Sequence, residues 1–172
     1  MSTSDRSGTV VVDVAIEAEL WAELPEAEAW VRRAADAAIA VAEVALRPDV
    51  ELSVLLSNDA RLHELNMVYR HQDKPTNVLS FPAEEPDALA DAPQLGDVVI
   101  AGETLLAEAK TDGKPPLHHL AHLVVHGTLH LLGHDHEDDE EAEAMEALER
   151  RALATLDISD PYRETVLAPG AE

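Results

Sequence analysis

The segment HGTLHLLGHDH, residues 126–136, places four histidines in eleven positions and constrains the fold more than any other feature of the chain. It continues the apolar stretch 116–132, whose spacing predicts a helix, and Gly133 is a natural residue to end that helix. Residues four apart on a helix share one face, so His126 and His130 can direct their ring nitrogens at one ion. The fold must therefore leave this face of the helix accessible.

A third histidine completes a metal-binding pattern. Gly133 lets the chain reverse, and His136 can then return toward His126 and His130. Three neutral imidazoles with one open position are typical of a catalytic zinc site, whereas a structural site uses four protein ligands. The alternative is a set of surface histidines that bond to water or to the backbone. The third histidine just beyond the glycine favours the metal.

The neighbouring histidines have other predicted roles. His119 and His122 lie on the same predicted face as His126, and we expect them to orient the ligands or to line a pocket. His134 lies in the turn, and no role is predicted for it.

The residue after the first histidine separates this pattern from the zinc proteases. The spacing H-x-x-x-H-x-x-G-x-x-H is used by metzincin proteases, which carry a glutamate general base directly after the first histidine. Here that position is Gly127. The ligands therefore predict a metal-dependent hydrolase, and the missing glutamate argues against proteolysis.

Composition limits the other possibilities. There is no cysteine, so thiolate ligands, thiolate nucleophiles and disulfides are excluded. The formal charge of −23, from 12 basic and 35 acidic residues, argues against nucleic acid unless a local basic patch exists. No apolar stretch has the length of a signal peptide or a membrane span, so we expect a cytoplasmic protein without a membrane partner.

The order of predicted elements indicates one α+β domain over residues 1–172, with a loosely ordered tail over about 159–172. Apolar and β-branched runs predict strands at 9–16, 50–57, 78–82 and 95–102. Helical spacing predicts helices at 26–46, 59–70, 103–111, 116–132 and 137–156. The acidic, proline-containing segment 84–94 is predicted to be a surface loop.

Two cations form a possible local basic patch. Arg70 ends the predicted helix 59–70, and Lys74 follows in the next loop. A guanidinium at this point can pair with a phosphate through two hydrogen bonds. The alternative, which the residues alone favour, is a helix C-terminus at which cations interact favourably with the helix dipole.

Two acidic features are also open to interpretation. Asp97, beside Gly96 at the start of a strand, is either a carboxylate behind the metal ligands or a turn residue. The acidic run 137–149 is predicted to form the solvated face of a helix.

The segment HGTLHLLGHDH resembles the signature H-G-x-L-H-L-x-G-Y-D-H of the YbeY family. These are bacterial single-strand-specific endoribonucleases implicated in rRNA maturation and ribosome quality control. Two further segments resemble the family in the same order, LNMVYRHQDKPTNVLSFP (65–82) and LGDVVIAG (95–102). The chain departs from the signature at His134, where tyrosine is usual.

The resemblance implies an α+β fold in which a small mixed β-sheet packs with helices and the metal-binding helix lies in a cleft. It implies one Zn²⁺ held by His126, His130 and His136, and it gives Arg70 a catalytic role on the RNA. Arg70 and Lys74 are then the predicted substrate-binding residues. The general base stays open between a metal-bound hydroxide and the 2′-hydroxyl group of the RNA.

The predicted partners are single-stranded RNA such as rRNA, and further ribosomal proteins or the small ribosomal subunit; no DNA is expected. Two other functions fit the residues. One is a zinc hydrolase of a peptide or small ester. Gly127 argues against the peptide substrate, because it replaces the glutamate base of the zinc proteases. The other is a ribosome-assembly factor with a mainly structural zinc, which the charge of −23 favours because contact with a basic protein is then easier.

Overall fold

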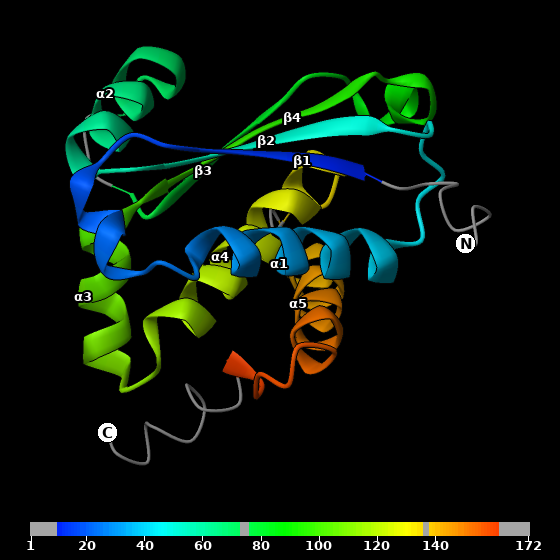
Figure 1. The fold of residues 1–172 in the computed structure, drawn as a ribbon. Coiled ribbons are helices and arrows are strands. Elements are labelled where there is room, and N and C mark those ends of the chain that lie inside the picture. Colours follow the sequence, from blue (N-terminus) through cyan, green and yellow to red (C-terminus); the bar gives the residue numbers. More distant parts are fainter. Residues whose placement is uncertain (1–9, 73–75, 136–137, 162–172) are drawn as a thin grey trace.

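The computed structural model describes residues 10–72, 76–135 and 138–161, and within them a four-stranded sheet packs with five α-helices (Figure 1). The strands are β1 (Val10–Ile16), β2 (Val50–Ser57), β3 (Val78–Pro82) and β4 (Gln94–Ala101). The α-helices are α1 (Ala27–Ala42), α2 (Asp59–Arg70), α3 (Gly102–Asp112), α4 (Pro116–Leu131) and α5 (Asp139–Ala154). Two short 3₁₀ helices are η2 (Glu19–Glu23) and η3 (Pro86–Asp91).

The sheet is mixed. Its strand order is β1-β2-β4-β3, with β1, β2 and β4 parallel to one another and β3 antiparallel to β4 at the edge. Ser80 of β3 stands opposite Val98 of β4 in this register. The predicted α+β class and the small mixed sheet are therefore confirmed.

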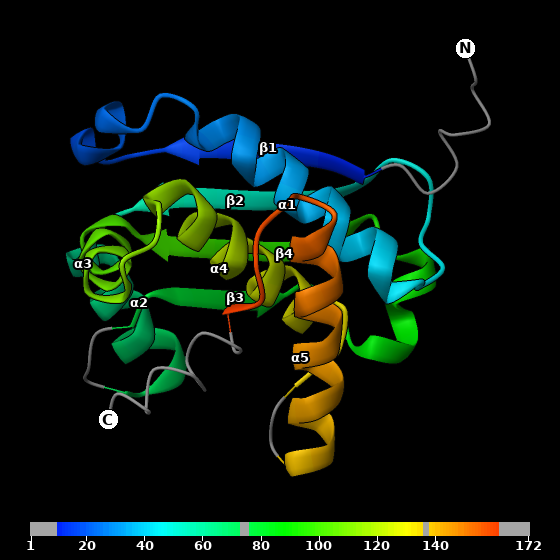
Figure 2. The same cartoon turned by 90° about the horizontal axis from the view of Figure 1, so that it is seen from below.

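The helices cover the two faces of the sheet unequally. The helices α1 and α4 lie across one face and α5 packs against them, whereas α2 lies at one end of the opposite face (Figures 1 and 2). The main core fills the first side with aliphatic side chains, among them the fully buried Leu56, Ile100 and Leu129. Buried alanines such as Ala34 and Ala38 let α1 approach this core closely. The helix α4 is thus buried along most of its length.

Reciprocal caps tie α2 to α3. The side chain of Asn58 accepts a hydrogen bond from the Arg61 backbone N–H at 2.8 Å, which makes Asn58 the N-cap of α2. The Asp59 carboxylate accepts from the backbone N–H of Thr104 at 3.0 Å, and Glu103 accepts from the backbone N–H of Asp59 at 2.7 Å. These bonds fix the start of the helix that ends at Arg70.

Two segments differ from their predicted structure. The predicted loop 84–94 contains η3, and Leu89 within it is only 3% exposed because its side chain enters the main core. The unpredicted η2 buries Trp21, whose indole N–H donates to the Ser57 carbonyl at 2.9 Å. In both, tertiary burial outweighs local composition. No helix within the described ranges has both the length and the apolar character needed to cross a membrane.

Candidate active site

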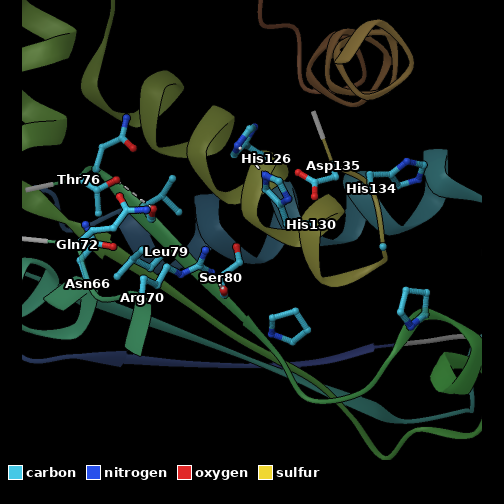
Figure 3. Close-up of a pocket in the computed structure, with 15 residues that line it drawn as sticks. Asn66, Arg70, Gln72, Thr76, Leu79, Ser80, His126, His130, His134 and Asp135 are labelled. Carbon is cyan, nitrogen blue, oxygen red and sulfur yellow. Dashed lines mark hydrogen bonds between the residues drawn. The ribbon is translucent and has the colours of Figure 1, made fainter. Parts of the chain in front are cut away.

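A cleft of about 580 Å³ opens between α4 on one side and the end of α2 with strand β3 on the other (Figure 3). We call the α4 side, with His126 and His130, the histidine wall. We call the opposite side, with Arg70 of α2 and Ser80 of β3, the arginine wall. Further polar residues that line the cleft are Asn66, Gln72, Thr76, Asn77, His134 and Asp135.

The two histidines of the histidine wall converge through the same ring atom. The Nε2 atoms of His126 and His130 are 3.2 Å apart, and the rings stand edge to face. In a tetrahedral zinc site with Zn–N bonds of about 2.0–2.1 Å, two ligand nitrogens lie roughly 3.3 Å apart. The two imidazoles therefore have the spacing of neighbouring ligands to one ion, and their donor chemistry fits zinc.

The predicted third ligand, His136, lies outside the described residues, as does the predicted substrate-binding residue Lys74. Within the described residues, no group of three histidine, aspartate or glutamate side chains is arranged to hold a metal ion. The described part of the site is thus a pair of converging imidazoles.

A buried carboxylate stands behind this pair. Glu149 of α5 is 1% exposed, and its Oε2 lies 2.7 Å from Nδ1 of His126 while its Oε1 lies 2.8 Å from Nε2 of His122. The prediction that the acidic run 137–149 forms a solvated face is therefore wrong for Glu149. The reason is its place on α5, where it falls on the same helical face as the buried Met145, Ala152 and Leu153.

The protonation of Glu149 follows from these contacts. Burial alone would raise the pKa of this carboxyl group, but the hydrogen bonds from His122 and His126 lower the pKa to about 2. An ionised carboxylate only accepts hydrogen bonds, so both imidazoles must donate to it. In a neutral His126 ring, Nδ1 then carries the proton and Nε2 presents its lone pair toward His130 and the cleft.

His119, one turn before His122, contacts a different carboxylate. Its Nε2 lies 2.8 Å from Oε1 of Glu108 on α3, and the Asn77 side-chain amide donates to the same oxygen at 3.0 Å. Burial lowers the pKa of His119, with the bond to Glu108 opposing that shift. Carboxylates from α3 and α5 thus hold successive histidines of α4.

The structure gives a physical reason for Gly127. A Cβ atom at this position would lie 2.8 Å from Cγ1 of Val98 and 3.1 Å from the Ser80 hydroxyl oxygen. The helix α4 therefore touches the sheet directly after His126, and no side chain has room there. The glutamate base of the zinc proteases is sterically excluded from this position.

Arg70 is placed by the way α2 ends. His71 adopts a left-handed conformation with φ 57°, and the backbone N–H groups of His71 and Gln72 donate to the Asn66 carbonyl. Arg70 then extends along β3, where Nη2 donates to the Ser80 carbonyl and the guanidinium carbon lies 5.6 Å from the centre of the Phe81 ring. Among the described residues that line the cleft, Arg70 is the only arginine or lysine.

Ser80 links the two walls. Its carbonyl accepts from Arg70, and its hydroxyl donates to the Gly127 carbonyl of α4 at 3.1 Å. One residue of β3 therefore contacts both the arginine and the histidine helix.

Asp97 lies on the other side of the sheet. It stands opposite Phe81 in the register, and its neighbour Val98 faces α4 at Gly127, so the Asp97 side chain projects from the opposite, α2-bearing face. The residue as a whole is exposed, and partial desolvation of its carboxyl group raises the pKa of that group. The interpretation of Asp97 as a carboxylate behind the metal ligands is therefore wrong.

Several bacterial proteins named as endoribonucleases are similar to this chain over most of its length. "Endoribonuclease YbeY" of Azorhizobium caulinodans is 53% identical over 152 residues, covering 88% of this chain and 95% of that protein. The protein of the same name from Rhodopseudomonas palustris (strain BisA53) is 55% identical over 155 residues, covering 88% and 90%. That from Bradyrhizobium diazoefficiens is 47% identical over 161 residues, covering 90% and 86%. The class is thereby defined as an endoribonuclease, which hydrolyses RNA phosphodiester bonds.

The particular family follows. A family model described as "Endoribonuclease YbeY" matches residues 15–157, and the chain belongs to this family, which is implicated in rRNA maturation. The predicted family and the RNA-hydrolase activity are confirmed. The solution structure of TM1509 from Thermotoga maritima has a TM-score of 0.51 at 24% identity, covers 88% of this chain and 98% of that one, and supports the fold.

Sequence reasoning missed Glu149, although one signal was available. The buried positions of α5 recur at helical spacing, and Glu149 occupies one of them in place of an apolar residue. A charged residue within a buried stripe needs a partner, and the histidines of α4 are the candidates by composition.

Proposed function

We propose that this endoribonuclease is zinc-dependent and specific for single-stranded RNA, with one Zn²⁺ held by His126, His130 and His136. The observation that carries the proposal is the 3.2 Å approach of the His126 and His130 Nε2 atoms in a cleft that also contains Arg70. When bound, zinc supplies a Lewis acid that polarises water or a phosphate oxygen.

In the proposed mechanism, Arg70 binds the scissile phosphate and stabilises the negative charge that develops on it. The guanidinium is planar and has further N–H groups besides the one that contacts Ser80, so it can offer two parallel hydrogen bonds to a phosphate. Lys74 is the second proposed substrate-binding residue. Because Arg70 is the only arginine or lysine among the described residues that line the cleft, we expect its contribution to be large.

The partners follow from charge. A protein of charge −23 repels the backbone of a long RNA except near the cleft, so we propose that a short single-stranded segment enters it. We further propose that the acidic surface contacts a basic ribosomal protein of the small subunit. Maturation of rRNA takes place where ribosomes are assembled, and we accordingly propose that the enzyme acts in the cytoplasm.

The test is cleavage of a single-stranded rRNA fragment by zinc-loaded protein, with a duplex of the same sequence and the His130→Ala variant alongside. We expect the wild-type protein to cut the single strand and to leave the duplex intact. The His130→Ala variant should lose both zinc and activity. His118→Ala is the matched control. His118 lies on the same helix, but its ring packs against Trp30, with the two ring centroids 5.4 Å apart. Equal cleavage by wild type and His130→Ala would refute the proposal.

A further inference from the structure

Glu149 is a buried charge that neither the proposed ligand set nor the proposed role of Arg70 uses. We propose that Glu149 is a positioning residue that fixes the ring orientation and the tautomer of His126, and that His122 holds Glu149 in place for this task. The inference rests on the proposed zinc site, for which His126 is a ligand. It assigns a role in metal binding to α5, which contributes no ligand to the proposed set.

The contacts place one carboxylate oxygen on each histidine. Oε2 of Glu149 is 2.7 Å from Nδ1 of His126, and Oε1 is 2.8 Å from Nε2 of His122. Short bonds of this kind between a carboxylate and an N–H group are among the stronger hydrogen bonds in proteins. With both oxygens engaged, the carboxylate has little freedom to rotate, and the His126 ring that it holds is fixed with it.

The choice of ring nitrogen is informative. The two histidines are one helical turn apart and bond to the same side chain, yet His122 uses Nε2 and His126 uses Nδ1. A bond through Nδ1 leaves the Nε2 atom of His126 to face Nε2 of His130 at 3.2 Å. A contact that served only to hold α4 and α5 together would not require this difference.

Burial adds a second argument. Glu149 is 1% exposed, His122 is 15% exposed at its side chain, and His126 is 24% exposed at its side chain. Exposure therefore rises from the carboxylate to the ring that reaches the cleft. A buried carboxylate is costly to remove from water and is retained where its hydrogen bonds serve a purpose. Carboxylates that accept from the second nitrogen of a ligating histidine raise its basicity and fix its orientation.

The first test compares zinc affinity in two variants of the full chain, measured by competition with a chromophoric chelator. Loss of such a supporting carboxylate typically weakens metal binding about 10–100-fold, and we expect Glu149→Gln to do so while the circular dichroism spectrum stays that of wild type. Glu146→Gln is the control, since it removes the same charge from the same helix at a residue that pairs with Arg150. We expect its zinc affinity to stay within about twofold of wild type.

The second test needs no variant at Glu149 and so remains decisive if Glu149→Gln does not fold. Nitrogen-15 NMR of the metal-free wild-type protein reports which imidazole nitrogen carries a proton, and His126→Gln assigns the His126 signals. The expected result is a protonated Nδ1 and an unprotonated Nε2 for His126. A proton on Nε2 instead would overturn the proposal.

The outcomes separate this inference from the zinc site on which it rests. If wild type binds zinc tightly and folded Glu149→Gln binds it equally well, the positioning role is wrong and the zinc site stands. If wild type binds no zinc, both fall together. If Glu149→Gln and Glu146→Gln weaken zinc binding equally, the effect is one of net charge and the positioning role is again wrong.

Discussion

The two walls of the cleft are built in opposite ways. The histidine wall belongs to a helix that is buried along most of its length, and Glu149 holds His126 from behind. The arginine wall joins the exposed end of α2 to β3, and there Arg70 donates to the Ser80 carbonyl and lies over the ring of Phe81. Metal ligands need fixed directions, because the ion tolerates little error in ligand geometry. A phosphate-binding guanidinium needs N–H groups that a ligand can reach, and the exposed end of α2 keeps Arg70 accessible.

The comparison implies that changes on the two sides should have different signatures. A change in the arginine wall should alter catalysis without altering metal content or stability. A change in the histidine wall should alter stability and metal binding together. Each of the predictions below can break or sharpen this distinction.

The largest effect is expected at Arg70. Arg70→Ala should lower the rate of RNA cleavage about 10²–10³-fold, as loss of one donor to a developing negative charge does in other enzymes. Zinc content and the urea midpoint should stay at wild-type values, because the side chain is exposed. The checks are a single-turnover cleavage assay and metal analysis of the same sample.

Arg61→Ala is the matched control, since Arg61 lies on the same helix but pairs with Glu17 and Glu64. Its cleavage rate should remain close to that of wild type. Loss of zinc from Arg70→Ala would show that the two walls are not independent.

A smaller effect, this time on stability, is expected at Gly127. Gly127→Ala should lower the free energy of unfolding by up to roughly 2 kcal/mol, which is the cost of overpacking against Val98 less the gain of about 1 kcal/mol for replacing a mid-helix glycine. The variant should also lose activity, because α4 must move away from β3. Urea denaturation and the cleavage assay measure the two effects.

Val98→Ala in the same protein should restore part of the loss, since it removes the methyl groups nearest the new Cβ atom. Strict additivity of the two substitutions would contradict the steric explanation.

The smallest effect is expected at the other end of α2, in the ion pair of Glu17 with Arg61, whose Nε lies 3.0 Å from Glu17 Oε1. Hydrogen bonds from Arg61 and Ser57 lower the pKa of Glu17 below its ordinary value of 4.5. The ionised group therefore stabilises the fold fully above pH 4.5, and this contribution is lost as the pH falls through the lowered pKa. Glu17→Gln should cause a slight loss of stability at pH 7 that disappears on acidification.

Urea midpoints for wild type and Glu17→Gln across this pH range provide the check, with 1 M salt as a second condition that should also shrink the difference. A difference that grew at low pH would contradict the assigned sign.

The parts of the molecule that could be predicted from sequence are those fixed by local pattern. Strand β2 has the predicted bounds 50–57 and α2 the predicted bounds 59–70, because strand and helix periodicity depend on nearby residues. The pairing of His126 with His130 follows from helical periodicity alone.

The parts that could not be predicted depend on contacts between distant segments. Glu149 lies 23 positions from His126, and its role depends on how α5 packs against α4. Leu89 is surrounded in sequence by acidic and small residues, and its burial depends on the core that it meets. In the same way, the contact between Arg70 and Ser80 depends on how the end of α2 packs against β3.

Ser80 has a consequence for the kind of substrate that the cleft accepts. Because the carbonyl of Ser80 accepts from Arg70 and its hydroxyl donates to the Gly127 carbonyl, one residue of β3 sets the spacing between the guanidinium and the imidazole pair. This spacing is set through the strand and does not depend on a direct contact between α2 and α4. An RNA segment that contacts both walls must therefore fit a spacing that the protein sets in advance.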